Sequence, residues 1–316
     1  MRTKKIYLLI FNLLLFTLWA FSQKKSIPFY LDQEKRIILE YTIKGEKVKL
    51  FLDTGTSDCV LDTKVSDKVN FLSHKDNREI TMTTIGNIPY KIILPDGLYK
   101  TDSIFNGSWG LTDMSITRKV LNLGDEVDGF VGINFKTNKI VEIDFQNNQL
   151  CFWDSVPQIY LNNFKGKKVA LVKSDFGRET KDSYLWSKDS YIKGVLTVAD
   201  TIQLHPIFLF DTGGSRYSVI VVYDSLLLKK MVAYKKIAYE KYGNNYPTTR
   251  LQLPELGIDS AYVRLNLLPK CFFDKKRIDL VEPNYVVGLL GVEFFLQYER
   301  ILFDCKNRIG YFIKKE

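Results

Sequence analysis

The chain has 316 residues, of which 46% are hydrophobic and 26% are charged, and this balance excludes a protein that is disordered throughout. The formal net charge is +9, but the lysines and arginines are scattered and form no long basic block. This distribution argues against a nucleic-acid-binding surface, so we expect no nucleic-acid partner.

The first segment, residues 1–22, has the pattern of a signal peptide. Basic residues precede an apolar run from Ile6 to Phe21, and Ala20 and Ser22 place small residues three and one before a cut. Cleavage there leaves 42 of the 45 basic residues against 36 acidic ones. We therefore expect a secreted or periplasmic protein. The alternative is a retained N-terminal membrane anchor, although the run is short for a spanning helix.

An internal repeat dominates the rest of the chain. Its opening part covers residues 41–57 in one copy and 195–215 in the other, and each copy is rich in β-forming residues. Each becomes apolar just before an Asp-Thr-Gly triplet, and the glycine indicates a tight turn. Asp53 and Asp211 are therefore each expected where a buried strand ends. Helical patterns follow, over roughly 63–72 and 224–242.

The closing part of the repeat also occurs twice, over residues 128–153 and 287–312. Each copy has two apolar residues and a glycine, then a strand, an Asn-bearing turn and a last strand. Gly132 lies 79 residues after Asp53, and Gly291 lies 80 residues after Asp211. The matched spacing predicts two lobes of one kind, at 23–153 and 170–316, with a connection at 154–169.

Two aspartates in duplicated turns predict one shared site. Carboxylates a few ångströms apart cannot both ionise easily, so they share a proton. The ionised one then activates a water, and the protonated one donates to a substrate carbonyl. Thr54 and Thr212 can bond across the axis between the turns. The catalytic candidates are Asp53 and Asp211, and the supporting residues are Thr54, Gly55, Thr56, Thr212, Gly213 and Gly214.

These two triplets, together with Phe130-Val131-Gly132 and Leu289-Leu290-Gly291, resemble the pepsin-like and retropepsin-like aspartic peptidases. The resemblance covers most of residues 27–316. It implies an all-β, bilobal, pepsin-like double barrel with a few short helices, whose lobes are related by a pseudo-twofold duplication. It also implies endopeptidase activity on a peptide or protein substrate, without a cofactor or metal. Because both halves lie in one chain, we expect a monomer.

Two positions depart from the family pattern. Pepsin-like enzymes carry Ser or Thr three residues after each aspartate, where the hydroxyl bonds the carboxylate. Thr56 fits this pattern but Gly214 does not, so Asp211 loses one stabilising donor. The family also closes its cleft with a hairpin that bears a tyrosine, for which we favour Tyr99 over Tyr90. A protein that binds peptides in the same cleft without turnover is therefore the rival interpretation.

The cysteines and histidines add little chemistry. An oxidising compartment permits disulfides, and the four cysteines allow three connectivities, among which the repeat favours pairing within each half. There is no C-x-x-C motif and there are only two histidines, His74 and His205. A metal site and a histidine-activated nucleophile are therefore both disfavoured.

Overall fold

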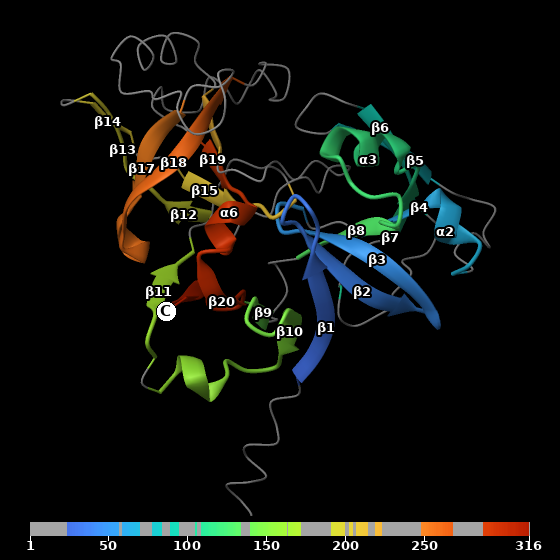
Figure 1. Ribbon diagram of the computed structural model, residues 1–316, viewed down its shortest axis with the longest axis horizontal. Helices are drawn as coiled ribbons and strands as arrows, with labels where there is room; N and C mark the ends of the chain where they lie inside the picture. The colour runs from blue at the N-terminus through green and yellow to red at the C-terminus, as the bar shows by residue number, and fades with distance from the viewer. Residues whose placement is uncertain are drawn as a thin grey trace, which may run out of the picture.

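The computed structural model shows a mostly β protein with a few short helices (Figure 1). In Figure 1 most of the first half lies at the right in blue and green, with β9 and β10 at the lower centre, and much of the second half lies at the left in yellow and orange. The structure describes residues 24–56, 59–69, 78–83, 89–94, 105, 109–133, 140–162, 164–171, 191–199, 202–204, 207–213, 219–222, 248–267 and 287–315. No helix in those ranges is both long enough and apolar enough to cross a bilayer.

One 13-stranded sheet runs through both halves of the chain. Its strands, in spatial order, are β11 (Lys167–Ala170), β21 (Ile309–Lys314), β20 (Tyr298–Asp304), β9 (Ile140–Asp144), β10 (Gln149–Trp153), β1 (Lys24–Leu31), β2 (Ile37–Ile43), β3 (Glu46–Asp53), β8 (Gly129–Gly132), β4 (Cys59–Asp62), β7 (Trp109–Thr112), β6 (Pro89–Leu94) and β5 (Arg78–Thr83).

The second half adds a 6-stranded sheet and a 2-stranded one. The larger has the order β12 (Tyr191–Lys193), β15 (Ile207–Phe210), β19 (Val287–Leu290), β16 (Val219–Val222), β18 (Ile258–Leu267) and β17 (Thr248–Leu253), and the smaller pairs β13 (Leu196–Ala199) with β14 (Ile202–Leu204). The helical segments are α2 (Thr63–Ser66), α3 (Ser115–Leu121), α6 (Val292–Phe295) and the 3-10 turns η1 (Gln158–Tyr160) and η2 (Pro254–Leu256).

The two halves repeat the same strand arrangement around each aspartate. In the first half β3 runs parallel to β8, β8 antiparallel to β4, and β4 parallel to β7. In the second half β15 runs parallel to β19, β19 antiparallel to β16, and β16 parallel to β18. The internal repeat seen in the sequence therefore corresponds to a repeated four-strand unit.

The hairpins that close the two copies join the halves to each other. β9 pairs with β10 and β20 with β21, and β9 and β20 pair antiparallel across the boundary. In that pairing Glu142 lies opposite Leu302. Each of these residues stands two positions before the aspartate of its own hairpin, Asp144 or Asp304. Equivalent residues therefore face each other, as a local twofold relation requires.

The strands β21, β20, β9 and β10 form the part of the sheet between the halves. This part has an inner and an outer face, because side chains alternate along a strand. Its inner face belongs to the main core, where Phe210 packs against Phe303 and Phe312 at centroid distances of 5.3 and 5.7 Å. On the outer face a smaller cluster contains Ile140, Leu302, Tyr311 and, from η1, Tyr160. The residue before Asp211 thus rests on the inner face, and η1 covers the outer one.

Four details differ from the sequence-based expectations or fall outside the described residues. The predicted helix over 63–72 is shorter: α2 has four residues, Thr63–Ser66, because β-branched Thr63 and Val65 with Ser66 and Asp67 give it little helical propensity. The second predicted helix, 224–242, lies outside the described residues. The predicted connection, 154–169, contains the start of β11, which pairs with β21. No disulfide joins Cys59 to Cys151, and Cys271 lies outside the described residues.

Candidate active site

Both aspartates of the repeat stand at the buried end of a strand, β3 or β15. Leu52 and Phe210, which directly precede them, have no exposed surface. Behind each turn lies the predicted apolar-apolar-glycine segment: Gly132 pairs with Asp53 in the parallel β3–β8 ladder, and the Asp211 backbone N–H donates to the Leu290 carbonyl at 3.0 Å. β3 is paired with β2 and β8, and β15 with β12 and β19, so each turn is held at its base by neighbouring strands.

Each aspartate folds back onto its own turn in the same way. The Gly55 N–H donates to Asp53 Oδ1 at 2.8 Å, and the Gly213 N–H donates to Asp211 Oδ1 at 3.0 Å. A backbone N–H that donates to a carboxylate favours the charged form and fixes the side-chain rotamer. Each triplet therefore presents its second carboxylate oxygen in a defined direction.

The two turns are locked together by reciprocal hydrogen bonds from their threonines. Thr54 Oγ1 donates to the Phe210 carbonyl at 2.7 Å and accepts from the Thr212 N–H at 3.0 Å. Thr212 Oγ1 donates to the Leu52 carbonyl at 2.8 Å and accepts from the Thr54 N–H at 3.1 Å. Both threonines are buried. The exchange is symmetric, so the turns cannot shift without breaking four buried bonds.

The lock brings each carboxylate against the glycine of the opposite turn. A Cβ on Gly213 would lie 2.0 Å from Asp53 Cγ, and a Cβ on Gly55 would lie 2.9 Å from Asp211 Oδ1 and 3.1 Å from Asp53 Oδ1. Because both oxygens lie this close to the same Cβ position, Asp53 Oδ1 and Asp211 Oδ1 are at most about 6 Å apart. Only glycine leaves room for this approach, which explains the residue type at both positions.

The two carboxylates differ in their exposure. Asp211 is 3% exposed, whereas Asp53 is only partly buried. Burial in a low-dielectric setting disfavours a charge, and the more accessible carboxylate keeps more of its hydration. A water that bridges the pair could therefore reach it from the side of Asp53.

The other predicted site residues fall into two groups. Thr56 is described, and its backbone N–H lies 3.4 Å from the Asp53 carbonyl. Tyr90 lies in β6, where it pairs with Met82 of β5, so it belongs to a hairpin of the first half. Gly214 and Tyr99 lie outside the described residues, so the missing hydroxyl and the flap tyrosine stay predictions from the sequence.

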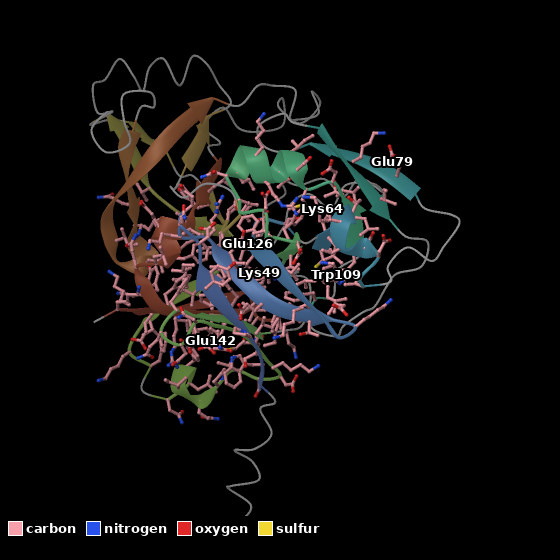
Figure 2. The ribbon with its side chains drawn as sticks, turned by 45° about the vertical axis from the view of Figure 1, so that its right-hand side comes forward. Lys49, Lys64, Glu79, Trp109, Glu126 and Glu142 are labelled. Carbon is pink, nitrogen blue, oxygen red and sulfur yellow. The ribbon has the colours of Figure 1, made fainter. Side chains whose placement is uncertain are left out.

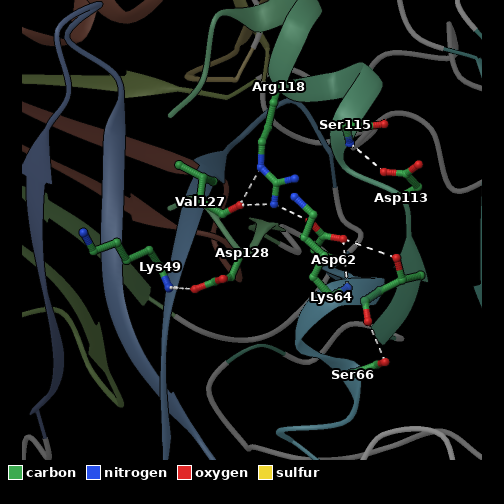
Figure 3. A network of polar contacts seen from close by, with 10 residues as sticks. Lys49, Asp62, Lys64, Ser66, Asp113, Ser115, Arg118, Val127 and Asp128 are labelled. Atoms are coloured by element: carbon green, nitrogen blue, oxygen red, sulfur yellow. Dashed lines mark hydrogen bonds and ion pairs between the residues drawn. The ribbon is translucent and has the colours of Figure 1, made fainter. Parts of the chain in front are cut away.

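A buried ion pair joins β4 to α3 in the first half (Figure 3). Asp62, at the end of β4, accepts a hydrogen bond from the Arg118 guanidinium of α3, and both side chains are almost fully buried. Arg118 Nε and Nη2 also donate to the Val127 carbonyl at 3.1 and 2.7 Å. Asp62 in turn caps α2 by accepting from the Lys64 N–H at 3.1 Å. The pair thus ties β4, α2, α3 and the segment before β8 into one unit.

The sequence analysis missed this pair, although one signal was present. An aspartate that directly follows an apolar strand and precedes Thr63 and Lys64 has the pattern of a helix N-cap. The partner could not be found in the same way, since Arg118 lies 56 positions away in the chain. A neighbouring hydrogen bond also joins residues far apart in the chain: Asp128 Oδ2 accepts from the backbone N–H of Lys49 at 2.9 Å (Figure 3).

Comparison with known proteins gives a structural likeness but no match in sequence. No protein-family model matches the chain, and no curated protein matches it. Among solved structures, conglutin gamma, a basic 7S globulin from lupine seeds, is similar to it with a TM-score of 0.48 and 10% sequence identity. The match covers 93% of this chain and 96% of conglutin gamma. Identity this low assigns no role to any residue.

Proposed function

We propose that this chain is an exported aspartic endopeptidase, in which Asp53 and Asp211 activate one water for the hydrolysis of a peptide bond. The observation that carries the proposal is the threonine lock, which holds two carboxylates on opposite turns at most about 6 Å apart, by the distances from Gly55. The repeated four-strand units support a bilobal, pepsin-like double barrel as the fold.

The proposed chemistry is general acid–base catalysis without a covalent intermediate. Two carboxylates this close share one proton, since ionising both would place like charges side by side. The ionised member takes a proton from the bridging water as the water attacks the scissile carbonyl. The protonated member donates to the carbonyl oxygen. A peptide or protein is the substrate, and one chain supplies both carboxylates.

The rival function is peptide binding without turnover. It is favoured by Gly214, which removes the hydroxyl that the resemblance leads us to expect beside Asp211. The lock, however, is a device for positioning the carboxylates, and a binder would gain little from it. The exchange of four buried bonds therefore favours the enzyme.

Cleavage of an unfolded protein across pH, from about 3 to about 7, tests the proposal. We expect cleavage at acid pH that is lost as pH rises and the shared proton leaves the pair. The substitutions Asp53→Asn and Asp211→Asn should each lower the rate by roughly 100-fold or more, since one carboxylate cannot do the work of two.

The control is Asp113→Asn, because this aspartate is exposed and accepts a hydrogen bond from the Ser115 N–H at the start of α3, away from the two turns. It should cleave as the wild type does. Peptide binding by a wild-type protein that shows no cleavage at any of these pH values would replace the enzyme with the binder. Cleavage that survives both aspartate substitutions would overturn the dyad.

A further inference from the structure

Two exposed aliphatic side chains stand together on the outer face of the sheet between the halves. Ile159 is 53% exposed and Leu161 is 54% exposed, while Tyr160 between them is 2% exposed. Ile159 lies in η1 and Leu161 directly follows it, in the connection between the halves. Among the described residues one other large hydrophobic side chain is exposed, Ile116 of α3. A paired exposure on one turn is therefore a local feature that calls for a partner.

The turn that carries these side chains is held firmly. The Tyr160 hydroxyl donates to Glu142 Oε1 at 2.5 Å, and Trp153 Nε1 donates to Glu142 Oε2 at 2.8 Å. The Tyr160 ring also packs against Phe164 and Tyr311, at centroid distances of 5.7 and 5.6 Å. Because Tyr160 is anchored in this way, Ile159 and Leu161 cannot turn inward to bury themselves. Figure 2 shows Glu142, the anchor, low in the molecule.

The surroundings of the two aliphatic side chains are basic. Lys165, Lys167 and Lys168 follow in the same segment and are exposed, whereas Asp154 is the only acidic residue of the connection. Lys168 Nζ lies 5.5 Å from the centre of the Tyr311 ring, so it stands beside the cluster that holds η1. Lys167 lies on the opposite side of β11, near Gly257, which leaves Lys165 and Lys168 for this face. Aliphatic side chains near lysines suit the boundary between the headgroups and acyl chains of an anionic bilayer.

This face points away from the candidate active site. The catalytic turns rest on the inner face of the sheet, through Phe210 against Phe303 and Phe312, and η1 covers the outer face. A surface bound at the outer face would leave both carboxylates accessible from the other side.

We propose that the outer face formed by Ile159, Leu161, Lys165 and Lys168 is a docking surface for an anionic lipid bilayer. It is a weak contact by itself, since two aliphatic side chains and a few lysines give reversible binding. Its effect is to orient the molecule with the active site turned away from the membrane.

Site-specific fluorescence on the full chain tests this docking surface. The variant Cys271→Ser provides the background, because Cys59, Cys151 and Cys305 are buried. Ile159→Cys and Leu161→Cys, each labelled with an environment-sensitive dye, are mixed with phosphatidylglycerol or with phosphatidylcholine vesicles. We expect a blue shift, and quenching by brominated lipid, on the phosphatidylglycerol vesicles. Ile116→Cys, on α3 at the opposite end of Figure 1, should show neither change.

Charge variants complete the test. Lys165→Gln should lower the apparent affinity for anionic vesicles, read from the dye shift, about fivefold. Lys47→Gln, at an exposed lysine in the first half, should leave this affinity unchanged. Equal responses at Ile159→Cys and Ile116→Cys, or no shift on either lipid, would overturn the proposal. A shift that needs no vesicles would do the same. If it rises with protein concentration, a second copy covers the face, and if it does not, the chain's own apolar run covers it.

Discussion

The hairpin turns and the two Asp-Thr-Gly turns, which we propose to be catalytic turns, are both duplicated, but they use their hydrogen bonds differently. In the hairpins Asn147 donates to Asp144 through its backbone N–H and its side chain, both at 2.9 Å. Asn307 does the same to Asp304, at 3.0 and 2.7 Å. Every one of these bonds stays within its own half. In the catalytic turns the threonine bonds all cross from one half to the other.

The difference separates local folding from positioning. A hairpin needs its Asp–Asn contacts to close its own turn, and each half can form them alone. The threonine lock has no meaning within one half, since each hydroxyl finds both partners on the opposite turn. Changes to the hairpins should therefore affect stability, and changes to the catalytic turns should affect activity.

The largest effect is expected from Gly213→Ala. The new Cβ would overlap the Asp53 carboxylate, at 2.0 Å from Cγ, and the movable side chain would give way rather than the backbone. We expect roughly a thousandfold loss of cleavage, with a melting temperature close to that of the wild type. Gly55→Ala meets Asp211 at 2.9 Å and should cost less. Full activity of the Gly213→Ala variant would show that cleavage does not depend on the position of the Asp53 carboxylate.

Next in size is the loss of the buried ion pair between β4 and α3. Asp62→Ala leaves the Arg118 guanidinium charged and buried without its carboxylate, so we expect a loss of about 3 kcal/mol in the free energy of unfolding. Chemical denaturation measures it. The comparison variant is Asp113→Ala, an exposed aspartate, for which the loss should stay below about 1 kcal/mol. Similar losses of unfolding free energy in both variants would show that the Asp62–Arg118 pair does not stabilise the fold.

A smaller effect is expected from Thr212→Val, which keeps the shape of the side chain but removes its hydroxyl. The Thr54 N–H loses its acceptor and the Leu52 carbonyl loses its donor, at a cost of about 1–3 kcal/mol. Cleavage should fall more than stability would explain, since the turns lose their register. Thr54→Val should behave alike. Activity that stays at the wild-type level in both variants would argue that the lock positions nothing.

The smallest effects are expected from Asn147→Ala and Asn307→Ala. Each removes one side-chain bond, so each should lower the free energy of unfolding by about 1 kcal/mol. Because the two turns share no bond, the losses should add in the double variant. Cleavage, measured on the folded fraction, should not change. A fall in activity without a fall in stability would blur the distinction between the two kinds of turn.

The sequence predicted the parts of the structure that rest on repetition and on local pattern. Apolar runs before Asp53 and Asp211 predicted buried strands, and the glycines predicted tight turns that the lock then brings together. The length of α2 was overestimated, since a periodic pattern extends past residues with poor helical propensity. Local rules therefore place an element well but fix its end poorly.

Contacts between distant residues could not be predicted in this way. Nothing in the sequence near Glu142 indicates that it accepts bonds from Trp153 and Tyr160, because the strand and the connection meet only after folding. The pairing of β9 with β20 has the same origin. Both depend on how the two halves pack, and that arrangement is a property of the whole chain.

The most direct test of the central claim is the binding of a peptide inhibitor whose central hydroxyl imitates the tetrahedral intermediate. Such a hydroxyl bonds two carboxylates at once, so its binding reports on the pair rather than on either aspartate. Thermal unfolding with and without the inhibitor, at acid pH, measures it. We expect the inhibitor to raise the melting temperature of the wild type and to leave Asp53→Asn and Asp211→Asn unchanged. The same rise in all three proteins would show that the inhibitor binds elsewhere, and that the carboxylates do not form one site.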